Sequence, residues 1–223
     1  MMTKNTTAPI IRAFITNLGK YNEGELVGEW HDFPTTREKL MQTFKEIGID
    51  GVNYEEFFIT DYDIEIKGVY DRLSEYESLD ELNYLAHKMS DLGEYELEIF
   101  EAALELGDYS NNLQSLINLI DNLNNFDYLY GVHTDYDLGY YWINESGAYD
   151  TESMGFLYNY VDYETFGRHV RLDEGGIFTN TGYIRDNGDS FYEEYDGTYI
   201  PDEYKVYSYS DLPGQMTLKL TNK

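Results

Sequence analysis

The stretch TNLGKYNEGELVGEWHDFP, residues 16–34, decides how the first part of the chain folds. The apolar run of residues 10–15 before it predicts a strand, and residues 26–33 predict a second strand. A phosphate-binding loop needs a Gly-Lys pair followed by serine or threonine at the start of a helix, whereas Lys20 is followed by Tyr21 and then by a predicted strand. We therefore expect the glycines to shape a connection between two strands and not to hold an anion.

The residues after this stretch predict a helix and a third strand. Thr35 and Glu38 have the spacing of a capping box, and the apolar side chains of residues 40–47 recur at the period of a helix. Gly48 is a suitable end for this helix, and residues 56–60 predict the strand. A small sheet with one covering helix follows from this pattern.

Two helices are predicted next. Ser78 and Glu81 form a second capping box, and the helix that they open is expected to end at Gly93. Residues 94–106 predict another helix with Leu97, Phe100, Ala103 and Leu104 facing inward. Its glutamates recur at i, i+4, i+7 and i+11 and lie on a different face.

The rest of the chain mixes both kinds of element. A helix is predicted over residues 112–123, a strand over 126–132, an aromatic helix or strand over 136–143, a short helix over 154–160, and β structure over 176–184. Beyond Asp186, turn signals alternate with tyrosine-rich segments, which predicts β hairpins.

The predicted fold class is α+β, as three small domains with a β-rich extension. The predicted boundaries are 10–67 for an N-terminal α+β domain, 68–108 for an acidic helical domain, 109–185 for an α+β domain, and 186–223 for the C-terminal extension.

The composition excludes several classes of protein. The chain carries 43 Asp and Glu against 15 Lys and Arg, so its formal net charge is −28. Such a surface repels nucleic acid and anionic membranes, and no stretch is apolar over the roughly 18–20 residues that a membrane span needs. The absence of cysteine excludes disulfides and thiolate zinc sites. With 24 Tyr and 11 Phe to bury, we expect a folded, soluble, cytoplasmic protein.

The charge is also unevenly distributed. Residues 89–167 contain 16 Asp and Glu and no Lys or Arg, and these acids alternate with apolar residues that form a core. A folded element with regular, unneutralised carboxylates is a rigid polyanion. Because duplex DNA carries one charge per ~1.7 Å, 28 charges correspond to about 14 base pairs. The pattern is compatible with imitation of DNA, and adaptation to high salt would also make a protein acidic.

Other sites have weaker support in the sequence. Two alternating acidic runs, residues 61–65 and 135–137, resemble calcium loops, but Ile66 and Arg72 replace the glycine and glutamate of an EF-hand. Among 43 carboxylates some pair will have the spacing of a glycosidase by chance, so such a pair is no evidence of that activity. The four histidines form no ligand pair, and no nucleophile elbow occurs. We predict neither an enzyme nor a bound metal or cofactor.

Three motifs carry a resemblance to a known family. NLGKYNEGELVGEW at 17–30, YYWINESGA at 140–148 and NYVDYETFGRHVRLDEGGIFTNTGYI at 159–184 resemble segments of the ArdA antirestriction proteins, which conjugative elements and phages carry to evade host defence. The resemblance covers residues 10–184. It implies an elongated, curved protein of three domains that dimerises through the third and displays carboxylates as bent DNA displays phosphates. The implied partner is the methyltransferase core of a type I restriction-modification enzyme, whose DNA-binding cleft the mimic occupies.

This resemblance leads to two sets of candidate residues. The carboxylates expected to contact the partner are Asp61, Asp63, Glu65, Glu75, Glu77, Asp80, Glu81, Asp91, Glu94, Glu98, Glu101, Glu105 and Asp108. The candidates for the dimer interface are Tyr128, Leu129, Tyr130, Tyr140, Tyr141 and Trp142, for which packing within the domain is the alternative. The extension exceeds a typical family member, and we expect its acids to lengthen the mimicked segment. Two alternative functions stay open, a mimic aimed at another DNA-binding protein and a calcium-dependent carbohydrate-active protein.

Overall fold

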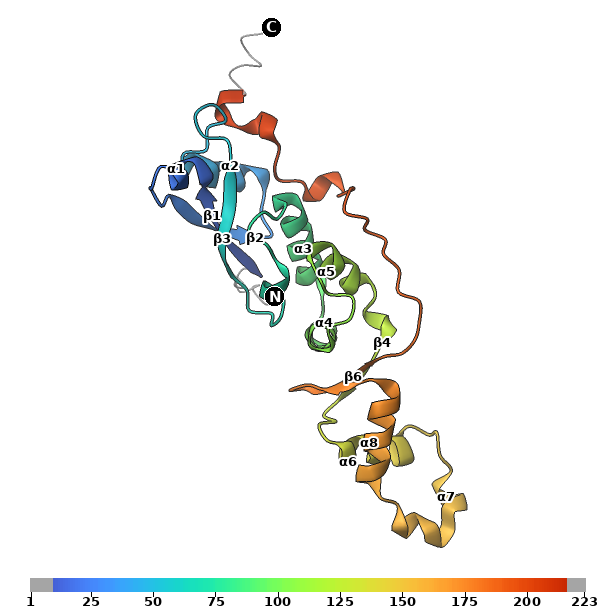
Figure 1. The fold of residues 1–223 in the computed structure, drawn as a ribbon. Coiled ribbons are helices and arrows are strands. Elements are labelled where there is room, and N and C mark those ends of the chain that lie inside the picture. The colour runs from blue at the N-terminus through green and yellow to red at the C-terminus, as the bar shows by residue number, and fades with distance from the viewer. Residues whose placement is uncertain (1–9, 216–223) are drawn as a thin grey trace, which may run out of the picture. The chain divides into compact units, whose positions relative to one another are not determined.

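The computed structural model describes residues 10–215, which form an α+β fold (Figure 1). The described residues divide into two compact units. Unit 1 contains residues 10–92, 109–120 and 193–215, and unit 2 contains residues 93–108 and 121–192. The three-domain division expected from the sequence stays a prediction. The helices α3 (Leu79–Asp91) and α4 (Glu94–Leu106), which that division groups together, belong to unit 1 and unit 2 respectively.

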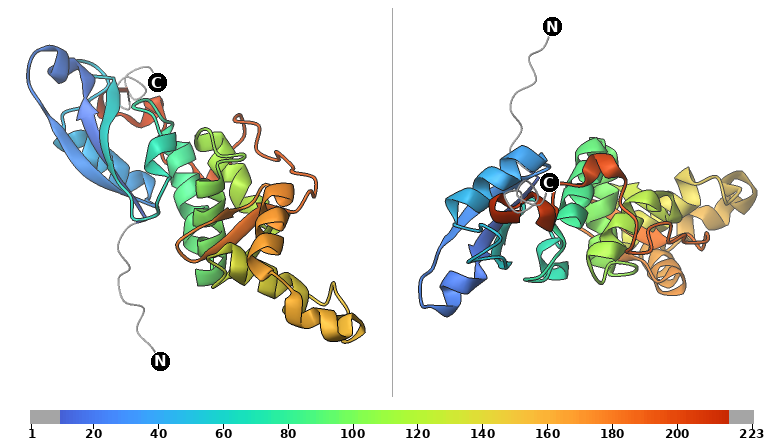
Figure 2. Two further views of the ribbon diagram at one scale, coloured as in Figure 1. Left: turned by 60° about the horizontal axis from the view of Figure 1, so that its bottom comes forward. Right: turned by 90° about the horizontal axis from the view of Figure 1, so that it is seen from above.

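Unit 1 is built on an antiparallel sheet of three strands, all of which the sequence predicts. The strands are β1 (Ile11–Asn17), β2 (Gly28–Phe33) and β3 (Phe57–Asp63), in the order β2-β1-β3. Ile11, Ala13 and Ile15 of the central strand are fully buried, because alternate residues of a strand point to the same face. The helix α2 (Arg37–Glu46) packs on this sheet (Figure 2), where the Phe44 and Phe57 rings lie 5.0 Å apart.

The connection between β1 and β2 contains a short helix that the sequence analysis did not predict. This helix, α1 (Leu18–Asn22), begins where the Asn17 side chain accepts a hydrogen bond from the Lys20 N–H. Glycine is required at two places for close packing: a Cβ at Gly19 would lie 2.5 Å from the Tyr54 ring, and one at Gly28 would lie 2.9 Å from the Ile15 carbonyl oxygen. The glycines thus shape this connection, as expected.

The cap of α2 differs from the prediction by one residue. Thr36, and not Thr35, is the N-cap, and its side chain accepts a hydrogen bond from the Lys39 N–H. Thr35 instead uses its hydroxyl to contact buried His31. The helix ends just before Gly48, whose φ of 77° suits glycine.

Unit 1 also contains α3 and nearly all of α5 (Leu113–Asp121). A 3₁₀ turn, Tyr70–Arg72, precedes α3, whose N-cap is Ser78 as predicted. The apolar face of α3 is buried in the core through Leu79, Leu82, Leu85, Ala86 and Met89. Gly93 does not end α3, because it is the N-cap of α4 and its N–H donates to the Glu96 carboxylate at 2.8 Å. The helix α5 follows α4 in the chain.

Unit 2 holds α4, whose bounds agree with the prediction, and a second antiparallel sheet. Its strands are β4 (Phe126–Tyr130), β5 (Ile177–Phe178) and β6 (Gly182–Asp186), in the order β4-β6-β5, and a 3₁₀ turn at Leu123–Asn125 leads into β4. Phe100, Ala103 and Leu104 are buried as predicted, and Leu97 is half-buried. The contacts of α4 with β4 and β6 place it on this sheet.

The helical part of unit 2 follows β4. The segment expected to be a helix or a strand is helical, as α6 (Asp135–Tyr140) followed by a π-helical turn, Tyr141–Glu145. The predicted short helix is α7 (Thr151–Met154) with a 3₁₀ turn, Gly155–Tyr160. The sequence analysis missed α8 (Tyr163–Glu174), which packs on α6. The two helices touch through their backbones, since a Cβ on Gly167 would lie 1.8 Å from the Asp135 carbonyl oxygen.

The prediction of β hairpins in the extension is wrong for its described part. Residues 187–215 contain no strand, and their only 3₁₀ turns with assigned bounds are Asp202–Tyr204 and Tyr209–Asp211. The expected turns are present, and Gly188 and Gly197 adopt the positive φ of 84° and 82° that favours glycine. However, the backbone between them is held by side chains of α5 and of the turns that follow it, and not by neighbouring strands.

Candidate partner-binding surface

The candidate carboxylates of unit 1 begin at the end of β3. Asp61, Asp63 and Glu65 are all exposed. Asp63 is neutralised in part by Arg12, whose guanidinium lies 3.2 Å from it and 3.0 Å from Asp32. These two partners raise the pKa of Arg12. Asp61 and Glu65 take part in no ion pair within the described chain.

The loop before α3 supplies the next two candidates. Glu75 is exposed, and Glu77 is half-buried with its carboxylate accepting a hydrogen bond from the Ser74 N–H at 2.8 Å. Glu77 therefore helps to fix the loop that leads into α3. Of these two groups, Glu75 is the more accessible.

Two candidates in the first turn of α3 form hydrogen bonds with the part of the chain that follows β6. The Asp80 carboxylate accepts hydrogen bonds from the N–H groups of Val206 and Tyr207 at 2.7 and 2.8 Å. The Glu81 carboxylate accepts one from the Tyr195 hydroxyl at 2.6 Å. Sequence reasoning could not assign these roles, because the donors lie more than 100 residues away. At the other end of the helix, Asp91 is exposed.

The candidates of unit 2 form one row along α4. Glu94 and Glu105 are exposed, whereas Glu98 and Glu101 are half-buried beside the core, and Asp108 is exposed just beyond the helix. In the part of the chain that the structure describes, none of these five carboxylates forms an ion pair. A carboxylate in the last turn of a helix is unfavourable, because the helix dipole is negative there. Glu105, in the last turn of α4, therefore keeps its charge at a cost in stability, whereas Glu94 lies in the first turn, where the dipole favours a carboxylate.

Most cations with an observed ion pair have a structural role. Arg37 pairs with Asp211, Lys20 with Glu25, and Lys205 with Asp202. In unit 2, Arg171 forms a two-pronged contact with Asp135, at 2.8 and 3.2 Å, and this hydrogen bonding lowers the pKa of Asp135. These pairs join elements within each unit and leave the α4 row unneutralised.

The residues considered for metal binding are not assembled into a site. The described residues contain no group of three or more His, Asp and Glu side chains placed to hold an ion. Of the second acidic run, Asp135 binds Arg171, and Asp137 closes the capping box of α6 with Thr134.

His31 is 5% exposed, and its ring nitrogens lie 2.8 and 2.9 Å from the hydroxyls of Thr43 and Thr35. Its burial lowers its pKa to about 4.

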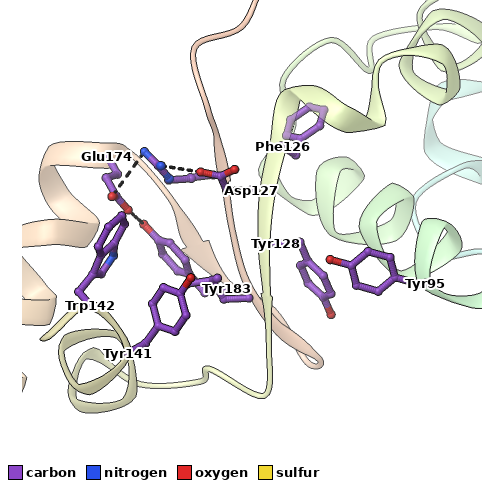
Figure 3. A pocket seen from close by; sticks show the side chains of 10 residues that line it. Tyr95, Phe126, Asp127, Tyr128, Tyr141, Trp142, Glu174 and Tyr183 are labelled. Atoms are coloured by element: carbon purple, nitrogen blue, oxygen red, sulfur yellow. Dashed lines mark hydrogen bonds and ion pairs between the residues drawn. The ribbon is translucent and has the colours of Figure 1, made fainter. Parts of the chain in front are cut away.

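The aromatic candidates for the dimer interface separate by exposure. Tyr128 is buried, and Leu129, Tyr141 and Trp142 pack against the cluster of Val132, Leu138 and Tyr183 inside unit 2. Tyr130 and Tyr140 are 71% and 41% exposed. Figure 3 shows Tyr95 and Tyr128 on one side of β4, with Tyr141, Trp142 and Tyr183 on the other. Of the six, Tyr130 and Tyr140 are the ones free to meet another molecule.

A cavity of about 290 Å³ lies around β4, and among the described residues that line it the one cation pairs with both carboxylates (Figure 3). Arg185 pairs with Asp127 and with Glu174, which is 3.4 Å away, and Glu174 also accepts a hydrogen bond from the Tyr183 hydroxyl at 3.0 Å. Burial raises the pKa of Glu174. This cluster holds α8 to the sheet.

Further exposed apolar side chains were not singled out from the sequence. Phe156, Leu157 and Tyr160, in the 3₁₀ turn after α7, are 74%, 72% and 70% exposed, and Leu172 of α8 is 66% exposed. The available signal was the run GFLYNY, residues 155–160, which has no charged residue. Exposed apolar residues of this size are a feature of interaction surfaces.

Comparison with known families adds a decisive observation. The family model described as "Antirestriction protein (ArdA)" matches residues 13–185, which is more than half of the chain. The chain belongs to the ArdA family. The match includes both sheets and the α4 row, and it ends before the segment that follows β6. A search of curated proteins finds no match.

Membership in the ArdA family gives the chain an antirestriction character. The family description names an inhibitor of restriction and no catalytic activity. Within residues 10–215, no helix is both long enough and apolar enough to cross a membrane. Family membership thus implies interaction with restriction-modification enzymes.

Proposed function

We propose that this ArdA-family protein inhibits type I restriction-modification enzymes by occupying the DNA-binding cleft of their methyltransferase core. The observation that carries the proposal is the row of α4 carboxylates without ion pairs, in a stretch of 79 residues that has no Lys or Arg. Such a cleft is basic and shaped for phosphates. Carboxylates on a folded scaffold can enter it without contacting bases and without forming or breaking any bond.

The spacing of the row supports imitation of a phosphate backbone. Four glutamates from Glu94 to Glu105 are spread over a rise of about 16 Å, since an α-helix rises 1.5 Å per residue. Neighbouring charges are thus separated by about 5 Å along the axis, compared with ~3.4 Å per phosphate in one DNA strand. Because phosphate contacts carry no direct sequence information, one such surface serves against enzymes with different recognition sites.

The candidate carboxylates differ in what they can contribute to this contact. Asp61, Glu65, Glu75 and Asp91 are exposed and carry no ion pair in the described structure, so we expect them to act with the α4 row. Asp63 is partly neutralised by Arg12, and the hydrogen bonds of Glu77, Asp80 and Glu81 are internal. We propose a supporting role for these four.

The proposal includes the finer properties that the family resemblance implies. These are an arrangement of three domains, a homodimer formed through the last of them, and action in the cytoplasm, where the target enzyme works. Tyr130 and Tyr140, with the apolar group of Phe156, Leu157 and Tyr160, are the exposed residues of unit 2 that we assign to the dimer. A second copy would double the length of the displayed polyanion.

The test is a competition experiment with the intact protein. A type I methyltransferase is bound to fluorescent DNA, and the protein is titrated at several salt concentrations. We expect displacement of the DNA, with inhibition weakening at least tenfold between about 50 and 200 mM salt, because counter-ion release drives such binding. DNA that stays bound at saturating protein, across several type I enzymes, would rule the proposal out. Displacement of DNA from an unrelated DNA-binding protein alone would support the broader mimic instead.

A further inference from the structure

Residues 193–215 lie in unit 1 as a segment with no strand and with short 3₁₀ turns, and they belong to the part of the chain that the family match does not reach. Their backbone needs hydrogen-bond partners wherever it is covered. In a sheet these partners would be another strand. Here side chains from α3 and α5 provide them.

The main contact is a side-chain amide that binds both backbone groups of one residue. The Asn118 Oδ1 accepts a hydrogen bond from the Tyr195 N–H, and its Nδ2 donates to the Tyr195 carbonyl oxygen, each at 2.9 Å. Gln114, one turn earlier on α5, donates to the same carbonyl at 3.2 Å. In unit 2, Asn122 holds both backbone groups of Tyr192 in the same way, also at 2.9 Å.

Two residues of α3 hold the backbone further along. The Asn83 Nδ2 donates to the Tyr204 carbonyl oxygen at 2.9 Å, and Asp80 accepts from the Val206 and Tyr207 N–H groups. A helix places residues three and four apart on one face, so Asp80 with Asn83, and Gln114 with Asn118, are each aligned along their helix. Contacts of this type recognise an extended backbone and not a particular sequence.

Side chains of the segment supply a small number of anchors. Tyr195, Ile200, Val206 and Leu212 are buried, at intervals of five or six residues. The Leu212 side chain fits against Gly51, where a Cβ would lie 2.7 Å from it. Main-chain hydrogen bonds combined with spaced side-chain pockets are how proteins commonly bind extended peptides.

The side chains that hold the backbone are polar, whereas side chains of the segment also meet apolar residues, as where the Tyr207 ring lies 5.6 and 5.4 Å from the rings of Phe44 and Phe57. Asn83 and Asn118 are 0% and 1% exposed under the segment, and the groups they present are amides that water can also satisfy. Because water can replace the backbone as the partner of these amides, release of the segment would leave none of them buried and unpaired. Both α3 and α5 also belong to the region of the family match, which the segment does not.

We propose that α3 and α5 of unit 1 form a preformed groove for an extended polypeptide backbone, and that residues 193–215 are a reversible ligand of this groove, tethered in cis. Release of the segment would free the carboxylates of Asp80 and Glu81. This inference concerns binding within the chain and does not depend on the target enzyme, so it can fail or succeed separately from the proposed function.

The test uses the full chain with one protease site placed in the exposed turn at residues 188–190. After cleavage, a fluorescent synthetic peptide of residues 191–215 is added, and its exchange with the cleaved fragment is followed by anisotropy. We expect the fragment to exchange and the peptide to bind with a Kd on the order of micromolar or below. Circular dichroism of the protein freed of its fragment should retain its helical signal.

A change in the peptide alone tests the mode of binding without altering the protein. N-methylation of Tyr195 removes the N–H that donates a hydrogen bond to the Asn118 Oδ1, and we expect about tenfold weaker binding of the peptide. N-methylation of Glu194, an exposed neighbour, is the matched control and should change the Kd much less. Equal effects of the two peptides, absence of exchange, or unfolding on loss of the fragment would each overturn the proposal.

Discussion

Asn118 binds Tyr195 through both of its backbone groups, with N–H to Oδ1 and Nδ2 to carbonyl distances of 2.9 Å each. The two residues are separated by 77 positions in the sequence. An amide on the buried face of a short helix thus takes the place of a neighbouring strand. The stability of unit 1 should depend on this side chain.

The first prediction concerns Asn118→Ala. The substitution removes two hydrogen bonds to Tyr195 and one to the Gln114 carbonyl oxygen at a site that is 1% exposed, so we expect the free energy of unfolding to fall by about 2–3 kcal/mol. Urea denaturation measures the change. Asn111→Ala, at an exposed amide before α5, is the control and should change stability by less than about 0.5 kcal/mol. Similar losses in the two variants would show that the contact with Tyr195 does not stabilise the fold.

The second prediction concerns the charge of α4. Replacing Glu94, Glu98, Glu101 and Glu105 with glutamine should weaken competition with DNA for a type I methyltransferase by roughly tenfold or more at low salt, and it should flatten the salt dependence. The control changes four exposed acids of the same unit, as Glu145→Gln, Glu152→Gln, Glu164→Gln and Asp173→Asn. Both proteins lose the same charge, so equal inhibition by the two would contradict a specific role for α4.

The third prediction concerns pH and His31. Burial lowers the pKa of His31 to about 4, below its value near 6.5 in the unfolded chain. The neutral ring therefore stabilises the fold above about pH 6.5, and this contribution is lost as the pH falls from there toward 4. Between about pH 7 and pH 5 the loss from this one group is about 2 kcal/mol. Unfolding measured at both pH values for the native protein and for His31→Gln should show the smaller change in the variant.

The fourth prediction concerns the crossing of α6 and α8. A Cβ on Gly167 would lie 1.8 Å from the Asp135 carbonyl oxygen, and backbone atoms cannot rotate away. We expect Gly167→Ala to destabilise unit 2 by at least about 3 kcal/mol, at the upper end of overpacking effects. His169→Ala, at an exposed position of the same helix, should be nearly neutral. Thermal unfolding of both variants decides whether the helices need this contact.

The fifth prediction concerns self-association. If the exposed aromatic residues of unit 2 form the dimer, the double substitution Tyr130→Ser and Tyr140→Ser should weaken it at least tenfold, because both rings are lost from an apolar contact. Analytical ultracentrifugation over a range of concentrations gives the dissociation constant. Tyr192→Ser removes an equally exposed ring outside this group and serves as the control. An unchanged dimer in the double variant would place the interface elsewhere.

Several elements could be predicted from the sequence because their signals are local. The bounds of α4 follow from apolar side chains that recur at helical spacing over residues 94–106. Ser78 caps α3 as its spacing with Glu81 indicates. The strands β1 and β3 follow from short apolar runs within residues 10–15 and 56–60. In each case the signal is a cap, a run of apolar residues or a periodicity that can be read within one short stretch of the sequence.

Other features depended on partners that no local pattern indicates. The sequence alone determined the polyanionic character, the α4 row, most of the strands and the family motifs, since each is a property of composition or short spacing. Only the tertiary structure decided that Thr36 caps α2 while Thr35 contacts His31, and that the extension is an extended segment and not a pair of hairpins. The reason is physical: a covered backbone takes whichever partner the fold brings near, and here that partner was a side-chain amide 77 residues away.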